Sequence, residues 1–187
     1  NIDGAPLGVA LSYLIGQFEV DAQQATGLSD PDFHQVARCL FYGDKAKGFG
    51  KPCPRDERQN CAFVDALPNS CVGEATIFLS WVWSYRLSTF IGALRQWALT
   101  SKIDVGTTFI WCCALCNNQF RIMEENSAIG SHNLANIFEP RLRSIGRMIA
   151  MLDAWRSPLY TTRIWCIFEV YVAEKLGIHF EIILPPG

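Results

Sequence analysis

A single carboxylate stands inside an apolar stretch near the end of the chain. Between Ile164 and Val172, Glu169 is the only acidic or basic side chain, and helical spacing puts it on nearly the same face as Trp165. Ionising a carboxylate in apolar surroundings is costly unless a partner compensates, so we expect a raised pKa and a candidate catalytic or ligand-facing group. The alternative is a structural ion pair, for which the nearby cations are Arg147, Arg156 and Arg163.

Polar and aromatic residues also follow the apolar runs that we expect to be strands. Hydrogen-bonding groups beside stacking surfaces suit a ligand the size of a nucleotide, although loop residues are commonly polar without any such role. The candidate ligand-binding residues are Ser80, Trp83, Arg86, Asn117, Asp153, Trp155 and Trp165.

The elements that must position these groups alternate between strand-like and helix-like segments after Gly73. Apolar, β-branched runs predict strands over residues 75–81, 107–114, 147–155 and 178–187, with helices between them. This alternation predicts an α/β fold, a flavodoxin-like, doubly wound parallel sheet of at least four strands. In such a sheet a ligand binds beyond the carboxyl ends of the strands.

Three helices are expected to connect these strands. In the first, Phe90, Leu94, Trp97 and Ala98 fall on one face. Ser131 is a good N-cap for the second, and Pro140 should end or kink it. The third covers residues 157–177 and carries Glu169, with Gly177 just after its end.

The first 73 residues are less regular, and we treat 1–73 as an N-terminal extension of helices and loops before an α/β domain at 74–187. Residues 5–26 have a helical pattern, and Ser29 or Asp30 could cap a short helix over residues 32–41. Residues 43–60 have the glycines, prolines and charges of an exposed loop.

Composition narrows the class of protein. Of the 187 residues, 50% are hydrophobic and 18% charged, which indicates a folded globular chain, and a net charge of −2 argues against nucleic acid as a partner. No apolar run is long enough to span a bilayer, although association with a membrane complex stays open. The chain starts at Asn1 without Met, so we expect processing or trimming, and organelle targeting stays open.

The eight cysteines are expected to be mainly buried thiols in an intracellular, reducing compartment. A disulfide among Cys39, Cys53, Cys61 and Cys71 remains an alternative. The pair Cys113 and Cys116 stands alone, whereas a structural zinc site needs four ligands, so we predict no metal site.

Several segments of the sequence resemble Toll/interleukin-1 receptor (TIR) domains. "TIFLSW", "RMIAMLDAWRSPLYTTRIWCIFEVYVAEKLG" and "FEIILP" resemble the first strand, the third strand with its helix, and the fourth strand of that family. "RIWCIFEV" is similar to the family pattern Trp-Cys-x-x-Glu, which aligns Trp165, Cys166 and Glu169 with it. In the NAD-cleaving members that glutamate is catalytic, so the resemblance implies this role for Glu169 and NAD as the substrate.

The sequence from Val72 onward resembles even more closely a group of TIR-like proteins that are abundant in dinoflagellate algae. The similar segments are "FLSWVWSYRLSTF", "TFIWCCALCNNQ" and "YTTRIW". Two departures from the TIR pattern stand out. The first strand runs into Trp81 and Trp83, which could fill the pocket, and the chain ends after the fourth strand where TIR sheets have five.

Two functions follow from the resemblance. One is a TIR-like interaction or assembly module, a subunit of a larger algal complex or a homo-oligomer, for which the abundant aromatic residues could serve as anchors. The other is an NAD glycohydrolase, in which Glu169 lowers the barrier, Trp83 or Trp165 stacks on a ring, and Arg86 or Arg156 meets the phosphates. We place the assembly role slightly ahead, because many TIR-like domains lack demonstrated turnover, and no cofactor is required by it.

Overall fold

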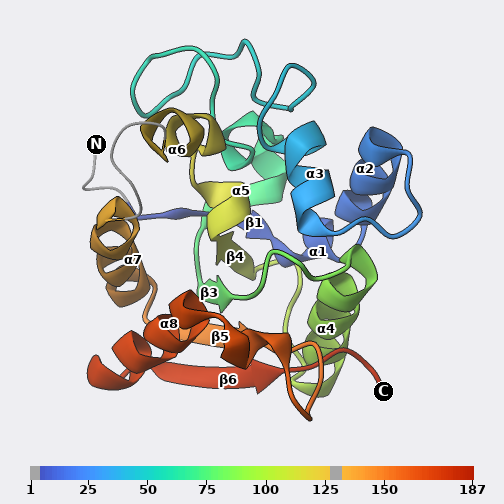
Figure 1. The fold of residues 1–187 in the computed structure, drawn as a ribbon, viewed down its shortest axis with the longest axis vertical. Helices are drawn as coiled ribbons and strands as arrows, with labels where there is room; N and C mark the ends of the chain where they lie inside the picture. Colours follow the sequence, from blue (N-terminus) through green and yellow to red (C-terminus); the bar gives the residue numbers. More distant parts are fainter. Residues whose placement is uncertain (1–4, 127–131) are drawn as a thin grey trace.

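The protein is an α/β protein built on one six-stranded, mixed and mostly parallel sheet (Figure 1). The computed structural model describes residues 5–126 and 132–187. Within them the strands lie in the order β2-β1-β4-β3-β5-β6. Their bounds are β1 Leu7–Ala10, β2 Val72–Glu74, β3 Ile77–Ser80, β4 Phe109–Cys112, β5 Arg147–Met151 and β6 His179–Ile183.

Four neighbouring strands, β4, β3, β5 and β6, are parallel to one another. All four residues of β3 are buried, as the apolar run predicts for a strand covered on both faces. The predicted strands 107–114 and 147–155 are too long. The chain leaves the sheet at Cys112 and Met151, because Cys113 begins a helical turn and Leu152 is followed by bends.

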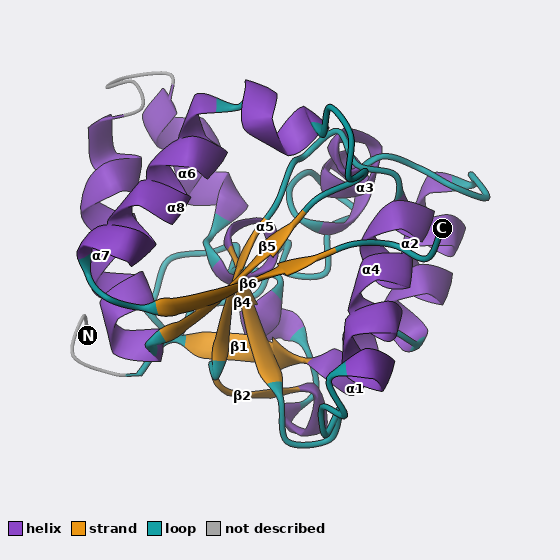
Figure 2. Ribbon diagram, turned by 90° about the horizontal axis from the view of Figure 1, so that it is seen from below, coloured by secondary structure: helices purple, strands orange, loops and turns teal. Residues whose placement is uncertain are grey.

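Helices cover both faces of this sheet (Figure 2). Helices α6, α7 and α8 lie on one side, whereas α1, α2 and α4 lie on the other. The eight α-helices of the described residues are α1 Leu11–Leu14, α2 Gln17–Thr26, α3 Phe33–Leu40, α4 Leu87–Thr100, α5 Cys113–Cys116, α6 Gln119–Asn126, α7 His132–Ile145 and α8 Ile164–Lys175. Three short 3₁₀ turns accompany them, η1 Val64–Ala66, η2 Asn69–Cys71 and η3 Leu159–Thr162.

One prediction about helices needs correction, one is narrowed, and one lies outside the described residues. Helix α7 continues through Pro140 to Ile145, so the proline does not end it, and the alternative of a kink stays a prediction. The buried side chains of Phe138 and Leu142 hold it on the sheet, so packing outweighs the lost hydrogen bond. The N-cap of α3 is Asp32, whose side chain accepts from the Gln35 backbone amide at 2.9 Å. Ser131, the predicted cap of α7, lies outside the described residues.

The N-terminal segment contributes β1 and most of β2 to the sheet. The prediction of a helical stretch over residues 5–26 is confirmed for α1 and α2 but is wrong for residues 7–10, which form a strand. Strand β1 lies antiparallel to β4 on one side and to β2 on the other, with Gly8 opposite Gly73. A Cβ atom on Gly73 would come within 2.6 Å of the Phe109 ring, so glycine permits this close approach. The two strands extend the sheet beyond β4, whereas a fifth parallel strand of the 2-1-3-4-5 order would pair with β6 at the other edge.

One aromatic cluster joins the N-terminal segment to the rest of the molecule. Phe18 of α2 is fully buried. Five rings surround it with centroids 6.0–6.5 Å away, those of Tyr13, Phe33, Phe41, Phe63 and Phe90. Because Phe90 belongs to α4, residues on both sides of position 73 form the same hydrophobic core.

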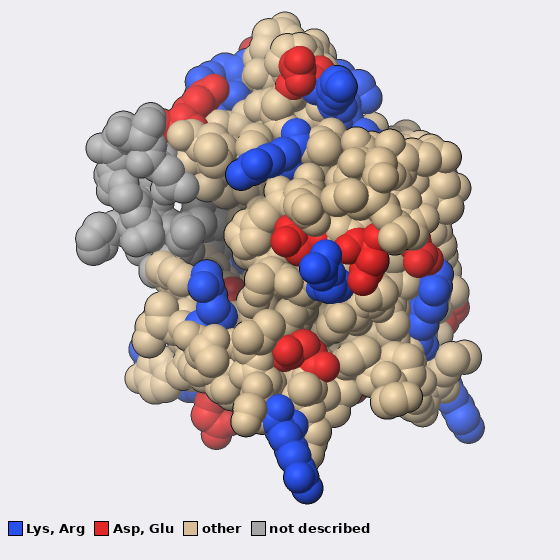
Figure 3. Space-filling model, turned by 45° about the vertical axis from the view of Figure 1, so that its right-hand side comes forward, with Lys and Arg blue, Asp and Glu red and all other residues tan. Residues whose placement is uncertain are grey.

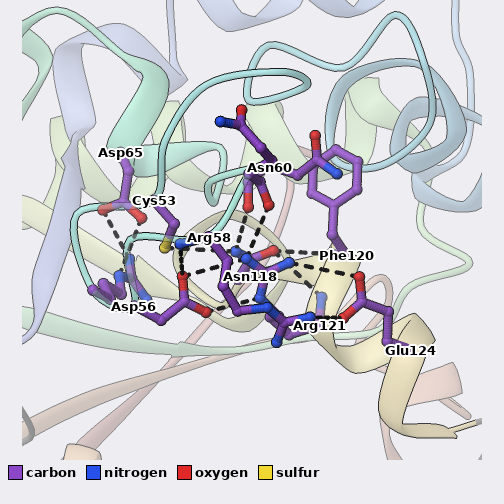
Figure 4. Close-up of polar contacts among 11 residues, drawn as sticks. Cys53, Asp56, Arg58, Asn60, Asp65, Asn118, Phe120, Arg121 and Glu124 are labelled. Atoms are coloured by element: carbon purple, nitrogen blue, oxygen red, sulfur yellow. Dashed lines mark hydrogen bonds and ion pairs between the residues drawn. The ribbon is translucent and has the colours of Figure 1, made fainter.

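The loop over residues 43–60 is held against α6 (Figure 4). Arg121 Nε donates to Asp56 at 2.8 Å, and the Asn118 amide donates to the Asn60 carbonyl oxygen at 2.8 Å. Arg58 pairs with Glu124, but both side chains are at least half exposed, so that pair adds little stability. Together these bonds fix a segment that the sequence predicts only as an exposed loop.

The surface shows basic and acidic side chains interspersed, without a broad field of one sign on the face in Figure 3. No helix within the described ranges has the length and apolar character needed to cross a membrane. All eight cysteines are free, so Cys39, Cys53, Cys61 and Cys71 form no disulfide.

Candidate functional site

A pocket of about 170 Å³ lies beyond the carboxyl ends of β3 and β4, under α7 and α8. This is the place that the rule for parallel α/β sheets predicts. Its volume is close to that of a cavity that holds one benzene ring, about 150 Å³. The lining residues are Trp81, Val82, Trp83, Trp111, Cys113, Asn117, Phe138, Arg163, Trp165, Cys166 and Glu169.

Glu169 projects from α8 into this pocket and has no ion pair among the residues that the structure describes. Its one hydrogen-bond partner there is Ser80, at the end of β3, whose hydroxyl donates to Glu169 Oε2. Burial raises the pKa of Glu169 from its ordinary value of 4.5 to about 7, and the Ser80 hydrogen bond opposes that rise. The carboxylate therefore changes its charge near neutral pH.

A short chain of hydroxyl groups supports the carboxylate. Tyr160 of η3 lies 2.5 Å from Ser80 Oγ and 3.3 Å from the Cys166 carbonyl oxygen. The Ser80 proton goes to Glu169, so the single proton of the Tyr160 hydroxyl has two acceptors within reach, Ser80 Oγ and the Cys166 carbonyl oxygen. Burial holds the pKa of Tyr160 well above its usual range, so this group stays a neutral donor. Ser80 is thus fixed in the orientation that stabilises the ionised glutamate.

Tryptophan side chains form the walls of the pocket and leave its interior open. Trp81 is 5% exposed and packs against Phe33, with ring centroids 4.3 Å apart. Trp83 stacks on Trp81 at 5.7 Å. The sequence allowed for these two rings to fill the pocket, whereas in the structure they border it together with Trp111 and Trp165.

Of the candidate binding residues, Trp83, Asn117 and Trp165 line the pocket, and Ser80 reaches it through Glu169. Three others lie elsewhere. Arg86 donates to the Asp30 carbonyl oxygen at 3.0 Å, beside the start of α4. Asp153 accepts from the Leu159 backbone amide at 2.9 Å, which fixes the turn before α8. Trp155 is 74% exposed and does not line the pocket.

Two residues that line the pocket, and Tyr160 behind Ser80, carry no signal in the sequence. Trp111 and Phe138 sit in patterns typical of a buried strand and a buried helix face, and both are mostly buried. Tyr160 lies in a 3₁₀ turn whose contact with Ser80 spans 80 residues of chain. Only the arrangement of the fold brings such groups to one place.

The cysteines at the end of β4 are not arranged as a metal site. Within the described ranges no group of three His, Cys, Asp or Glu side chains could hold an ion. Cys116 is buried, and its sulfur accepts from the Cys112 backbone amide at 3.4 Å. Burial raises the pKa of Cys116 to about 12, so the thiol stays protonated and unreactive.

Comparison with known proteins finds no match for this chain. The chain matches no protein-family model, no curated protein and no solved structure. The TIR resemblance therefore rests on the sequence phrases quoted above.

Proposed function

We propose that the protein hydrolyses the N-glycosidic bond between nicotinamide and ribose in an NAD-like dinucleotide. The observation that carries the proposal is the state of Glu169. It faces an open pocket, it forms no ion pair among the described residues although Arg163 lines the same pocket, and its pKa of about 7 leaves it ionised in much of the population at neutral pH. A glutamate with a purely structural role would be expected to have a compensating partner.

The proposed reaction needs one carboxylate and one water molecule. The bond from ribose C1′ to the pyridinium nitrogen breaks, the electron pair leaves with neutral nicotinamide, and the sugar becomes oxocarbenium-like. Ionised Glu169 stabilises that positive charge at short range, and the apolar walls strengthen the effect. Water then adds to C1′ and releases a proton, giving ADP-ribose.

The dimensions of the pocket agree with this assignment. A volume of about 170 Å³ has room for one flat ring, and the surrounding tryptophans offer faces on which nicotinamide can stack. The rest of a dinucleotide must then lie outside this pocket.

The order of the parallel strands supports the TIR-like, flavodoxin-like interpretation. Counted along the chain from β3, the four parallel strands follow the order 2-1-3-4, as do the first four strands of the flavodoxin-like order 2-1-3-4-5. Strands β1 and β2 extend the opposite edge with antiparallel pairing, a feature that the family resemblance does not account for.

The test is to incubate the purified protein with NAD and to follow free nicotinamide and ADP-ribose by chromatography. We expect the two products in equal amounts, increasing with protein concentration. Absence of both, with the protein folded and concentrated enough to oligomerise, would refute the proposal.

A second candidate function is assembly, because α8 also carries an exposed apolar stripe. Ile164 is 78% exposed, Ile167 45% and Tyr171 61%, and their spacing puts them on neighbouring turns of the helix. Apolar side chains so exposed, grouped on one helix, are typical of a protein-interaction surface. The occupant that we propose is the same stripe of a second copy, paired about a twofold axis.

The Ile164→Asp variant tests this role. We expect the wild-type chain to dimerise with increasing concentration in sedimentation velocity, and I164D to remain a monomer, because dimerisation would bury the new charge. Leu99→Asp is the matched control, since Leu99 is 76% exposed on α4, which lies on the other side of the sheet. A wild-type chain that stays monomeric, or an I164D dimer, would contradict the proposal.

A further inference from the structure

A second pocket of about 240 Å³ lies beside the first and shares two of its wall residues, Trp111 and Asn117. It is bounded by the start of β1, the loop that precedes η1, and α7. Two of its lining side chains are arginines, Arg55 from the loop and Arg141 from α7. Most of the remaining wall is apolar, formed by Ala5, Pro6, Leu7, Pro54, Trp111 and Cys116.

The charges that line this pocket do not balance. Asp65 is the single carboxylate among the described lining residues, and it pairs with Arg55: Arg55 Nη2 donates to Oδ1 at 3.1 Å, and Nε lies 3.1 Å from Oδ2. Arg141 has neither a hydrogen bond nor an ion pair within the described ranges. Two arginines against one aspartate leave the described part of the lining with one net positive charge.

The pairing with Asp65 also fixes the direction of Arg55. Because Nε and Nη2 face the carboxylate, the donors of Nη1 meet no acceptor in the part of the chain that the structure describes. The loop that carries Arg55 is itself held on α6 by the bonds of Asp56 and Asn60 (Figure 4). Arg55 is therefore a positioned donor rather than a mobile surface side chain.

The position of Arg141 is electrostatically unfavourable, and no contact within the described part of the fold compensates for it. It is partly buried, and both that burial and the neighbouring Arg55 lower the pKa of its guanidinium group. A cation beside another cation in partly apolar surroundings destabilises the empty protein. An anion between the two arginines would remove that cost and bind in the two-pronged manner typical of arginine with phosphate.

We infer that this second pocket binds the phosphate group of the nucleotide whose nicotinamide riboside lies at Glu169, with Arg55 and Arg141 as its ligands. The inference rests on the proposed function. In a nicotinamide nucleotide the phosphate is joined to the ribose, so its site must adjoin that of the ribose, and the shared residues Trp111 and Asn117 meet this condition. The assignment replaces Arg86, which lies beside α4, and Arg156, which lines neither pocket.

The experiment compares two probes that differ only by the phosphate, nicotinamide mononucleotide and nicotinamide riboside. Their dissociation constants are measured by calorimetry for the wild-type protein, Arg141→Gln and Arg143→Gln. Arg143 is the matched control, because it lies on the same helix but pairs with Glu139 at the surface. We expect the wild type to prefer the mononucleotide about tenfold or more, R141Q to lose that preference, and R143Q to keep it.

Thermal melting without ligand shows whether R141Q is folded. If Arg141 is kept for an anion, R141Q melts at the same or a higher temperature than the wild type. A lower melting temperature would indicate a structural role and contradict the inference.

The outcomes separate this inference from the proposed function. Equal affinity of the wild type for both probes, or a preference that survives in R141Q, overturns the phosphate site and leaves the site at Glu169 standing. If neither probe binds, inorganic pyrophosphate is titrated next. Binding that depends on Arg141 then supports an anion site while refuting the nucleotide assignment and the proposed function, and no binding refutes all of them.

Discussion

Replacing Glu169 with glutamine is expected to reduce nicotinamide release from NAD by about 10³-fold or more, with little change in KM. Glutamine keeps the size of the side chain and can still accept from Ser80, but it has no charge to oppose the oxocarbenium-like sugar. Losing one hydrogen bond to a developing charge costs about 10²–10³ in rate, and losing a full charge in apolar surroundings should cost at least as much. Initial rates over a range of NAD concentrations measure the effect.

The pH dependence of the wild-type rate tests the same carboxylate in another way. With a pKa of about 7, Glu169 is mostly protonated below neutrality. If the ionised form acts, kcat/KM rises about tenfold per pH unit below 7 and levels off above it.

The free energy of unfolding should change with pH in the opposite direction to the rate. Because the pKa of Glu169 is raised above 4.5, the stabilising contribution of this group is fully present below pH 4.5 and is lost as pH rises through about 7.

Glu174→Gln provides the matched control. Glu174 is exposed on the same helix, one turn and a half from Glu169, and it lines neither of the two pockets. We expect E174Q to keep the wild-type rate and pH profile. E169Q should also fold, since the buried carboxylate is itself unfavourable when ionised. Equal activity of E169Q and wild type would rule out the catalytic role even if NAD is cleaved.

Replacing Phe18 with alanine is expected to lower the free energy of unfolding by about 3–5 kcal/mol. Phe18 is fully buried among five aromatic rings, and alanine would leave a cavity that rigid neighbours cannot fill. Because these rings come from both sides of position 73, we expect one cooperative transition rather than separate melting of an N-terminal extension. Denaturation followed by tryptophan fluorescence and by circular dichroism measures both quantities.

Phe49→Ala is the control for this loss of stability. Phe49 is 50% exposed in the loop over residues 43–60, so its replacement should change stability by only about 0.5 kcal/mol. Two separate transitions in F18A, with only the first at lower denaturant, would show that residues 1–73 fold independently and would contradict the single core.

Strands β3, β4 and β5 could be predicted because each is a short run whose side chains are nearly all buried, whereas β6 at the edge of the sheet is only partly buried. Strand β1 could not, since "LGVA" continues directly into "LSYLIG", and the combined run of residues 7–16 has the length of a helix. The pairing of β1 with β4 decides the matter, and it depends on Val9 meeting Ile110, about a hundred residues away. The local sequence pattern cannot predict such a long-range contact.

The site shows the same division between local and distant information. Glu169 could be found because a carboxylate is conspicuous among apolar neighbours, and Ser80 because it ends a predicted strand. Arg86 donates to the Asp30 carbonyl oxygen, and its position after a strand does not reveal that contact. Arg55 and Arg141 stand among ordinary polar residues, and only the fold brings them to one cavity.

The single hydroxyl partner of Glu169 bears on how this position could change during evolution. No ion pair among the described residues depends on the carboxylate, and Ser80 could donate equally well to an amide. Folding alone therefore exerts no selection to keep an acid at position 169, and a lineage that used the chain only for assembly would be free to lose it. Selection would therefore keep an acidic residue at position 169 only through an activity that needs its charge.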